Sequence, residues 1–448
     1  AWTDVMQVTF LVGGGLVTAY AALDVISTKL ELNGALDALS YIMGHLSSIP
    51  GDTHFNLVVE RNADLYPVLE GTATQPSDPY FDIPGITVIV GALWLTNLGY
   101  WGFNQYIIQK GLAAKSLAEA KKGMIFAAFL KILIPFIVCI PGVCAFYIVN
   151  YQPELTQTLA GAIERSDDAY PFLIRNFTPT VVKGLSFAAL AAAVISSLAS
   201  MFNSTSTIFT MDIYKKFINK TASEKKLVNV GRLTSLASLV IALLAVYPIM
   251  GGADQAFQII QEYSGFVYPG VVVIFGLGLL WKRASGVAAV VTAIGTFVFS
   301  IAFKFMMPGT PFLLRMGYVF MVLVVLFFTL SYMSNKTVKA EQLDAHTTKT
   351  QLFWGNVMLV LAIICFLVGC IVFFGDITLL KNYGFEAIFF LGTFFLSLWI
   401  YLRSNALDTV QDGKAVAIDL SLFRSDRSFT IGSALVVIIL AILYIVLW

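Results

Sequence analysis

Apolar stretches long enough to cross a lipid bilayer recur along the whole of this 448-residue chain. A helix rises 1.5 Å per residue, so about 20 residues span the hydrocarbon core. Only 12% of the residues are charged, and the mean hydropathy is +0.81. The sequence therefore predicts an all-α integral membrane protein. We expect eleven spans, at residues 5–25, 84–108, 123–149, 181–213, 230–250, 256–281, 286–307, 316–334, 352–375, 385–402 and 430–448.

The distribution of basic residues predicts the orientation of these spans. Nineteen Lys and Arg residues lie in or beside the loops that follow the even-numbered spans, against seven in the other loops. Cytoplasmic loops carry the excess of Lys and Arg. We therefore expect a multi-pass protein of the cell's inner (plasma) membrane, in contact with the lipid bilayer and with Trp448 on the extracytoplasmic side. The basic residues are scattered, which gives no indication of a nucleic-acid partner.

The second span, residues 84–108, is apolar at its ends and polar in its middle. The segment from Thr96 to Gln105 holds two glycines, three amides and three aromatic side chains, among them the large rings of Tyr100 and Trp101. Each glycine weakens a helix by about 1 kcal/mol relative to alanine. Backbone groups freed inside a membrane need partners in protein or in a water-filled cavity. A broken span of this kind is a candidate small-molecule site. The alternative is a kinked helix whose polar groups are satisfied by its neighbours.

Small and hydroxyl side chains recur on one face of span 181–213. Ala193, Ser196 and Ser197 follow the i, i+3, i+4 spacing of a single helical face. Two hydroxyls and a backbone carbonyl provide hard oxygen ligands, which suit a small hard cation. Small residues at this spacing also let two helices pack closely, and packing alone would explain the pattern.

Three further polar side chains stand out at membrane depth. Lys131 lies about 12 Å inside its span, where a lysine needs a partner or water, although its long side chain could instead extend to the inner surface. Gln261 and Glu262 lie near the outer end of span 256–281 and could pair within the bundle or contact a ligand. Asp4 lies close to the inner interface, where a charge costs little.

Several stretches of the chain, in this order, resemble the solute:sodium symporter family, and most closely its bacterial sugar-transporting branch. The matching stretches are AWTDVMQV, LWLTNLGYWGFNQYIIQKGLAAKSLAEAKKG, FAAFLKILIPF, FAALAAAVISSLASMFNSTSTIFTMDIYKK, KLVNVGR, QAFQIIQEYSG and FRSDRSF.

The resemblance implies a LeuT-type fold of two inverted five-helix repeats. Residues 1–281 would hold the fifth core helix and the complete second repeat, whose broken first helix is span 84–108. Residues 282–448 would be peripheral helices, with an extra hairpin formed by 352–375 and 385–402. The family's first four core helices have no counterpart in this sequence. We therefore expect an incomplete sodium site and no transport by these 448 residues alone.

The resemblance also implies a sugar site. Asn97 is similar to the family's ligand for sugar hydroxyls, and Lys131 and Gln261 to further hydrogen-bonding partners. Tyr100 resembles an inner gate stacked on the sugar ring, with Trp101 beside it. This agrees with the chemistry of sugars, which bind through hydroxyl hydrogen bonds and an aromatic platform.

The remaining implied roles concern the wall of the site and the coupling ion. Phe257 resembles part of a hydrophobic wall. Ala193, Ser196 and Ser197 resemble one half of a sodium site. Asp4 resembles an acidic residue near the ion's cytoplasmic exit.

The expected function is sodium-coupled symport of a galactose- or glucose-like sugar by alternating access, with no enzymatic activity. Within the family, the solute could instead be an inositol, proline or a nucleoside. Asn97, Lys131 and Gln261 favour a polyol over an amino acid, which would call for a partner to its carboxylate. A solute sensor and an inactive fragment are the alternatives from other classes.

Overall fold

The structure is a computed structural model, and the residues that it describes form helices joined by short connections. It describes residues 2–49, 54–58, 85, 88–159, 161, 163–251, 256–281, 283–307, 310–334, 345–374, 391–399 and 426–446. Every regular element within these ranges is helical, as predicted. The helices are α1 (Trp2–Lys29), α2 (Ala35–Ser47), η2 (Ile89–Leu93), α4 (Trp94–Leu98), η3 (Gly99–Phe103), α5 (Gln105–Leu112), α6 (Leu117–Ile132), α7 (Ile134–Tyr151), α8 (Pro153–Thr158), η4 (Ser166–Asp168), α9 (Ala169–Phe177), α10 (Thr180–Thr207), η5 (Ile208–Ile218), α11 (Glu224–Met250), α12 (Ala256–Gly265), α13 (Tyr268–Leu280), α14 (Gly286–Met306), α15 (Phe312–Ser334), α16 (Ala345–Phe374) and α18 (Arg427–Val446).

Seven helical segments of the described part are long and apolar enough to cross a membrane, and an eighth is a bent pair. They correspond to predicted spans 1, 3, 4, 5, 7, 8 and 11, and the bent pair to span 6. The predicted second span is broken into shorter helices, and α16 occupies the position of span 352–375. Of the predicted span 385–402, only residues 391–399 lie within the described part, and these are helical.

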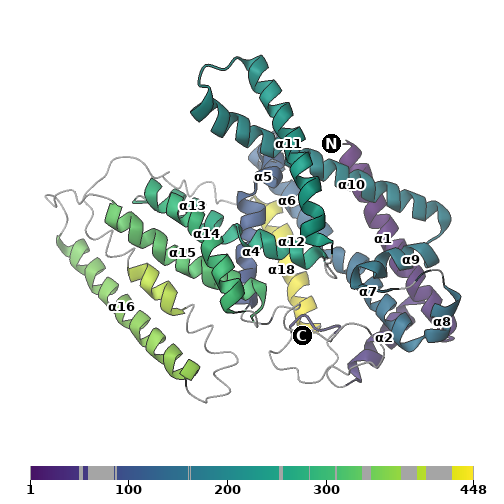
Figure 1. The fold of residues 1–448 in the computed structure, drawn as a ribbon. Helices are drawn as coiled ribbons and strands as arrows, with labels where there is room; N and C mark the ends of the chain where they lie inside the picture. Colours follow the sequence, from purple (N-terminus) through teal and green to yellow (C-terminus); the bar gives the residue numbers. More distant parts are fainter. Residues whose placement is uncertain are drawn as a thin grey trace.

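Two neighbouring glycines allow α1 to pack closely against two other helices. A Cβ atom at Gly14 would collide with the Ser186 hydroxyl of α10, and one at Gly15 would collide with Ile137 of α7. Small residues at such positions let helix backbones approach each other. Figure 1 shows α1 (purple) beside α7 and α10, and the contacts between these helices agree. The predicted sodium ligands Ala193, Ser196 and Ser197 lie on α10, within this group of helices.

A second group consists of α13, α14 and α15, which lie side by side in Figure 1. Its apolar core includes Trp281, Leu323 and Phe327. The preceding helix, α12, meets α13 at an angle of 41°. The Thr296 hydroxyl of α14 donates to the Phe266 carbonyl at this bend, at 3.0 Å. A carbonyl freed at a bend inside the membrane therefore has a buried partner, as backbone groups in hydrocarbon require.

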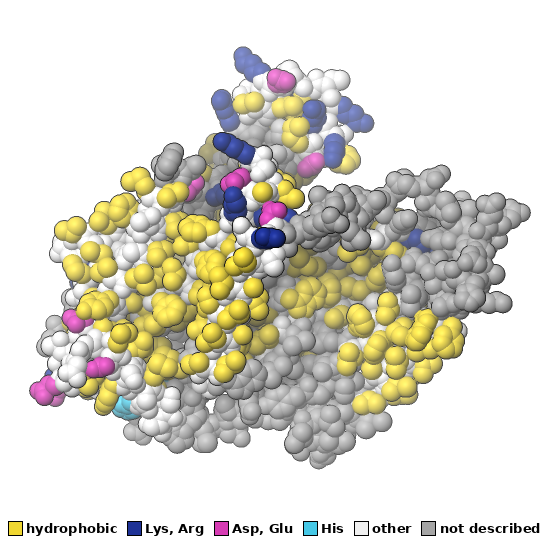
Figure 2. Space-filling view, turned by 180° about the vertical axis from the view of Figure 1, so that it is seen from behind, with side chains coloured by type: hydrophobic (Ala, Val, Ile, Leu, Met, Phe, Trp, Pro, Cys, Tyr) yellow, Lys and Arg dark blue, Asp and Glu magenta, His cyan; other side chains and the backbone are white. Residues whose placement is uncertain are grey.

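The surface of the molecule has the character expected of a membrane protein. Figure 2 shows hydrophobic side chains over much of the visible described face, and Lys and Arg side chains gathered at its upper end. The segment from Lys215 to Arg232, which covers the end of η5 and the start of α11, holds six basic residues: Lys215, Lys216, Lys220, Lys225, Lys226 and Arg232. Large apolar side chains on α11, such as Leu243 and Leu244, are 63% and 72% exposed.

Candidate functional site

The broken helix runs from Ile89 to Leu112 and changes its hydrogen-bonding pattern three times. Two π-helical turns, η2 and η3, flank the short α4, and the chain then becomes extended at Asn104 (φ −87°, ψ 116°) before α5 begins. Gly99 is buried where this segment meets α13. A Cβ atom there would lie 2.8 Å from Cδ1 of Tyr268. The predicted interruption of span 84–108 is therefore confirmed, and Gly99 is required by the close approach to α13.

The amide of Asn97 is partly used by its own helix. Its Nδ2 donates to the Leu93 carbonyl at 2.9 Å, and the residue is exposed. The Leu93 carbonyl lies at the end of the π-helical turn η2, so Asn97 satisfies a backbone group near the irregular turn. The interpretation in which polar groups are satisfied within the protein therefore holds for one amide hydrogen of Asn97, and its role as a sugar ligand stays a prediction, with Oδ1 and the second amide hydrogen not used by that contact.

Tyr100 and Trp101 form an aromatic cluster at the break. Their rings lie edge to face, with centroids 5.4 Å apart. The Tyr106 hydroxyl, on the far side of Asn104, donates to the Tyr100 hydroxyl at 2.7 Å. The Lys131 ammonium of α6 lies 4.6 Å from the centroid of the Trp101 ring, a cation–π distance. The structure thus brings together three of the predicted sugar-site residues.

A hydrogen-bonded link between α5 and α10 was not predicted. Gln109 donates through Nε2 to the Ser200 carbonyl at 3.3 Å and accepts at Oε1 from Asn203 Nδ2 at 3.4 Å. Asn203 lies one turn beyond Ser200 on the face that carries Ser196. The row of polar side chains on one face of span 181–213 could have predicted that this face packs against another polar segment.

The predicted sodium ligands lie in the middle of α10, opposite α1. The Ser196 hydroxyl donates to Asp4 Oδ1 at 3.1 Å. Ser196 and Ala193 are half-buried, and Ser197 is exposed. A carboxylate of α1 and a hydroxyl of α10 therefore meet at this point, although the two residues are 192 positions apart in sequence. Carboxylate, hydroxyl and carbonyl oxygens are ligands suited to a hard cation.

The two predicted site residues of α12 are less closely associated with the rest. Gln261 is half-buried, and Phe257 is 71% exposed. Within the described part of the chain, neither makes a hydrogen bond or ring contact with Asn97, Tyr100 or Lys131. Gln261 and Phe257 both lie on α12, and the described part of the structure shows no such contact between them and the aromatic cluster.

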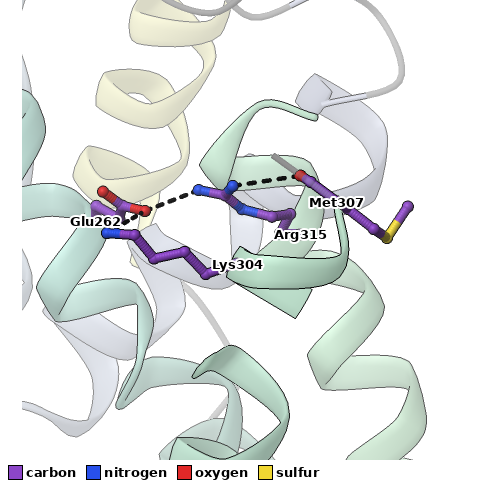
Figure 3. A network of polar contacts seen from close by, with 4 residues as sticks. All are labelled: Glu262, Lys304, Met307 and Arg315. Carbon is purple, nitrogen blue, oxygen red and sulfur yellow. Dashed lines mark hydrogen bonds and ion pairs between the residues drawn. The ribbon is translucent and has the colours of Figure 1, made fainter. Parts of the chain in front are cut away.

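Glu262, beside Gln261, is paired within the bundle. Its Oε1 lies 2.7 Å from Arg315 Nη2 and 3.2 Å from Lys304 Nζ. Figure 3 shows the three side chains meeting between α12, α14 and α15. Of the two interpretations of Glu262, pairing within the bundle is therefore the one that the structure supports.

The chain is similar to known proteins over much of its length. Residues 1–295 match the Sodium:solute symporter family. The chain is 44% identical over 340 residues to a Sodium/glucose cotransporter of Vibrio parahaemolyticus, in a match that covers 74% of this chain and 58% of the relative. It is 34% identical over 295 residues to the human Sodium/myo-inositol cotransporter 2, a match that covers 62% of this chain and 42% of the relative. The matches therefore span only about half the length of these relatives.

A solved structure shares the fold. It is a Na⁺-coupled sialic acid symporter in a substrate-bound, outward-open state, with a TM-score of 0.54 and 23% sequence identity. The match covers 76% of this chain and 63% of that one. The predicted LeuT-type, all-helical architecture is confirmed by this likeness.

Proposed function

This chain belongs to the sodium:solute symporter family, and from that premise we propose that the protein carries a sugar and sodium together across a membrane. The observation that carries the proposal is the cluster at the break of the second predicted span. There the ring of Trp101 lies edge to face with Tyr100 and under the ammonium of Lys131. An aromatic surface beside hydrogen-bond donors and a polar amide suits a polyhydroxylated ring. The names of the Vibrio and human relatives, which refer to glucose and myo-inositol, support the same class of solute.

The coupling ion in this proposal is sodium. Ala193, Ser196 and Ser197 would contribute oxygen ligands, and Asp4 would lie on the ion's route to the cytoplasm. The contact between Ser196 and Asp4 supports this, because it places a carboxylate beside the proposed ligands. Hard cations of this kind usually take about six oxygens, so residues outside this set would complete the site.

Alternating access follows from the position of the site at a helix break. A bound sodium would favour the outward-open state, sugar would close the outer gate, and both would leave inward past Tyr100. One sodium ion crossing about 100 mV contributes about 2.3 kcal/mol. A tenfold sodium gradient adds about 1.4 kcal/mol. Together they would support a sugar gradient of a few hundredfold.

The membrane topology is part of the same proposal. Residues 1–281 would form the transport core and residues 282–448 the peripheral helices, with Trp448 on the extracytoplasmic side of the inner membrane. The basic segment between η5 and α11 supports this orientation, since Lys and Arg are concentrated in cytoplasmic loops.

Myo-inositol is the second candidate substrate, because one relative bears that name. It presents hydroxyls around a ring, as a hexose does. Proline and nucleosides fit the cluster less well, and a sensor would bind the solute without moving it.

The test is uptake into proteoliposomes that contain the product of the complete gene. Under an inward sodium gradient, radiolabelled galactose, glucose, myo-inositol and proline are supplied in turn. We expect concentrative uptake of a hexose or of myo-inositol, and none when potassium replaces sodium. Binding without uptake would favour a sensor. Uptake of proline in preference to every polyol would contradict the proposed substrate class.

A further inference from the structure

An ion-pair cluster joins α12 to two helices of the neighbouring group. Glu262 of α12 accepts from Arg315 of α15 at 2.7 Å and pairs with Lys304 of α14 at 3.2 Å. The Arg315 Nη1 also donates to the Met307 carbonyl at 3.4 Å, as Figure 3 shows. The side chains of Glu262 and Arg315 are only 20% and 14% exposed. A pair in such a position has little of the solvent screening that makes surface ion pairs weak.

The cluster is too closely packed to hold a solute itself. The cavity beside it has a volume of about 10 Å³ and is lined by Glu262, Arg315, Ser300 and neighbouring apolar side chains. That volume is enough for about one water molecule. The Lys304 ammonium also lies 5.7 Å from the ring centroid of Tyr263 and 5.9 Å from that of Phe266. Lys304 therefore contacts α12 at Glu262 and Tyr263, and contacts the turn that follows α12 at Phe266.

The first residue of α12 is held by a different part of the chain. The backbone N–H of Ala256, the first residue of α12, donates to Asp167 Oδ2 at 3.0 Å. A carboxylate at this end also interacts favourably with the helix dipole. Asp167 belongs to η4, which precedes α9 in the group around α1. The ten-residue helix α12 is thus attached to one helix group at its first turn and to the other at Glu262.

The pairing of Glu262 fixes the rotation of α12 about its own axis. Successive residues of an α-helix are about 100° apart, so Gln261 is turned by that angle from the side that faces Arg315. Phe257 lies four residues before Gln261, on the same face. Phe257 is 71% exposed and Gln261 is half-buried, so the Phe257 end of this face is largely uncovered by the described residues.

We propose that Glu262 is a positioning residue for the sugar, because its ion pair with Arg315 and Lys304 sets the rotation of α12 and with it the direction of the Gln261 side chain. Asp167 has the corresponding role at the first turn of the helix. The proposal rests on the proposed sugar site, in which Gln261 is a ligand. Glu262 itself touches no solute and acts through Gln261.

The experiment is a double-mutant cycle on sodium-driven sugar uptake by the product of the complete gene. Glu262→Gln keeps the shape of the side chain and removes its charge, and we expect the sugar KM to rise about tenfold with the maximal rate within twofold. In a Gln261→Ala background the same change should raise KM no further, since contacts that act as one unit are not additive. An equal rise in both backgrounds would overturn the proposal. Glu154→Gln is the control, because the Glu154–Lys29 pair also joins two helices, at 3.1 Å, but is exposed.

A second variant and a measurement that does not depend on transport test the same proposal. If Glu262→Gln does not fold, Arg315→Lys retains the charge and loses the planar guanidinium, and it is carried through the same cycle. Amide hydrogen exchange of residues 256–265 does not depend on transport. It should become faster in Glu262→Gln and remain unchanged in Glu154→Gln, and unchanged exchange in both would overturn the proposal. A wild-type protein without sodium-dependent sugar uptake would instead refute the proposed function.

Discussion

Replacement of Asn97 by alanine tests the sugar site at the residue whose contacts are best defined. One amide hydrogen of Asn97 bonds the Leu93 carbonyl at 2.9 Å, so Oδ1 and the second hydrogen remain for a sugar hydroxyl. Loss of those contacts would leave a bound hydroxyl unpaired, at a cost of about 1–3 kcal/mol. We expect Asn97→Ala to weaken sugar binding roughly ten- to a hundredfold. Binding is measured by equilibrium titration of the purified transporter in the presence of sodium.

A matched control separates this effect from damage to a helix. Asn150 of α7 donates through Nδ2 to the Phe146 carbonyl at 2.9 Å, which is the same contact at the same spacing. Asn150→Ala should cost the same helix hydrogen bond, about 0.5–1.5 kcal/mol of stability, and leave sugar affinity unchanged. Affinity of Asn97→Ala within twofold of wild type would show that the amide serves only its own helix.

Three further changes test other parts of the account. Ser197→Ala should raise the sodium concentration for half-maximal uptake several-fold at unchanged expression, and an unaltered sodium dependence would exclude Ser197 as a ligand. Tyr106→Phe removes the 2.7 Å hydrogen bond to Tyr100, worth about 0.5–1.5 kcal/mol, so efflux of preloaded sugar should accelerate about two- to tenfold. An unchanged efflux rate would mean that this bond does not restrain the gate. Gly99→Ala places a Cβ 2.8 Å from the Tyr268 ring and should destabilise the protein by about 1–3 kcal/mol, which thermal unfolding in detergent checks. Unfolding at the wild-type temperature would show that α13 yields without cost.

The break in the second predicted span could be predicted because its cause is local. Gly99, Gly102 and the amides between apolar ends are visible in the sequence, and helix propensity acts over a few residues. The boundary between α6 and α7 was not predicted, although both helices belong to one apolar segment, Leu117–Tyr151, which corresponds to the predicted span 123–149. The regular helix is interrupted at Leu133, two residues before Pro135, because a proline has no N–H to donate to the carbonyl four residues before it and is best accommodated in the first turn of a helix.

Contacts between distant segments could not be read from the sequence. Ser196 and Asp4 are 192 residues apart, and Glu262 and Arg315 are 53 apart. Each contact forms only if two helices are rotated so that these side chains face each other, and the packing of the helices determines that rotation. Lys131 was expected to need a partner or water at membrane depth, or to extend to the inner surface; the ring of Trp101, which lies 4.6 Å from its ammonium, could not be predicted as its neighbour because only the fold brings α6 near η3.

Coupling of the two solutes is the central claim, and sodium flux driven by sugar tests it most directly. Proteoliposomes with the product of the complete gene are given equal sodium concentrations inside and outside, a clamped membrane potential and an inward gradient of the transported sugar. We expect radiolabelled sodium to accumulate inside until the sugar gradient collapses, and Ser197→Ala to weaken this flux. Sugar entry without any movement of sodium would contradict the account.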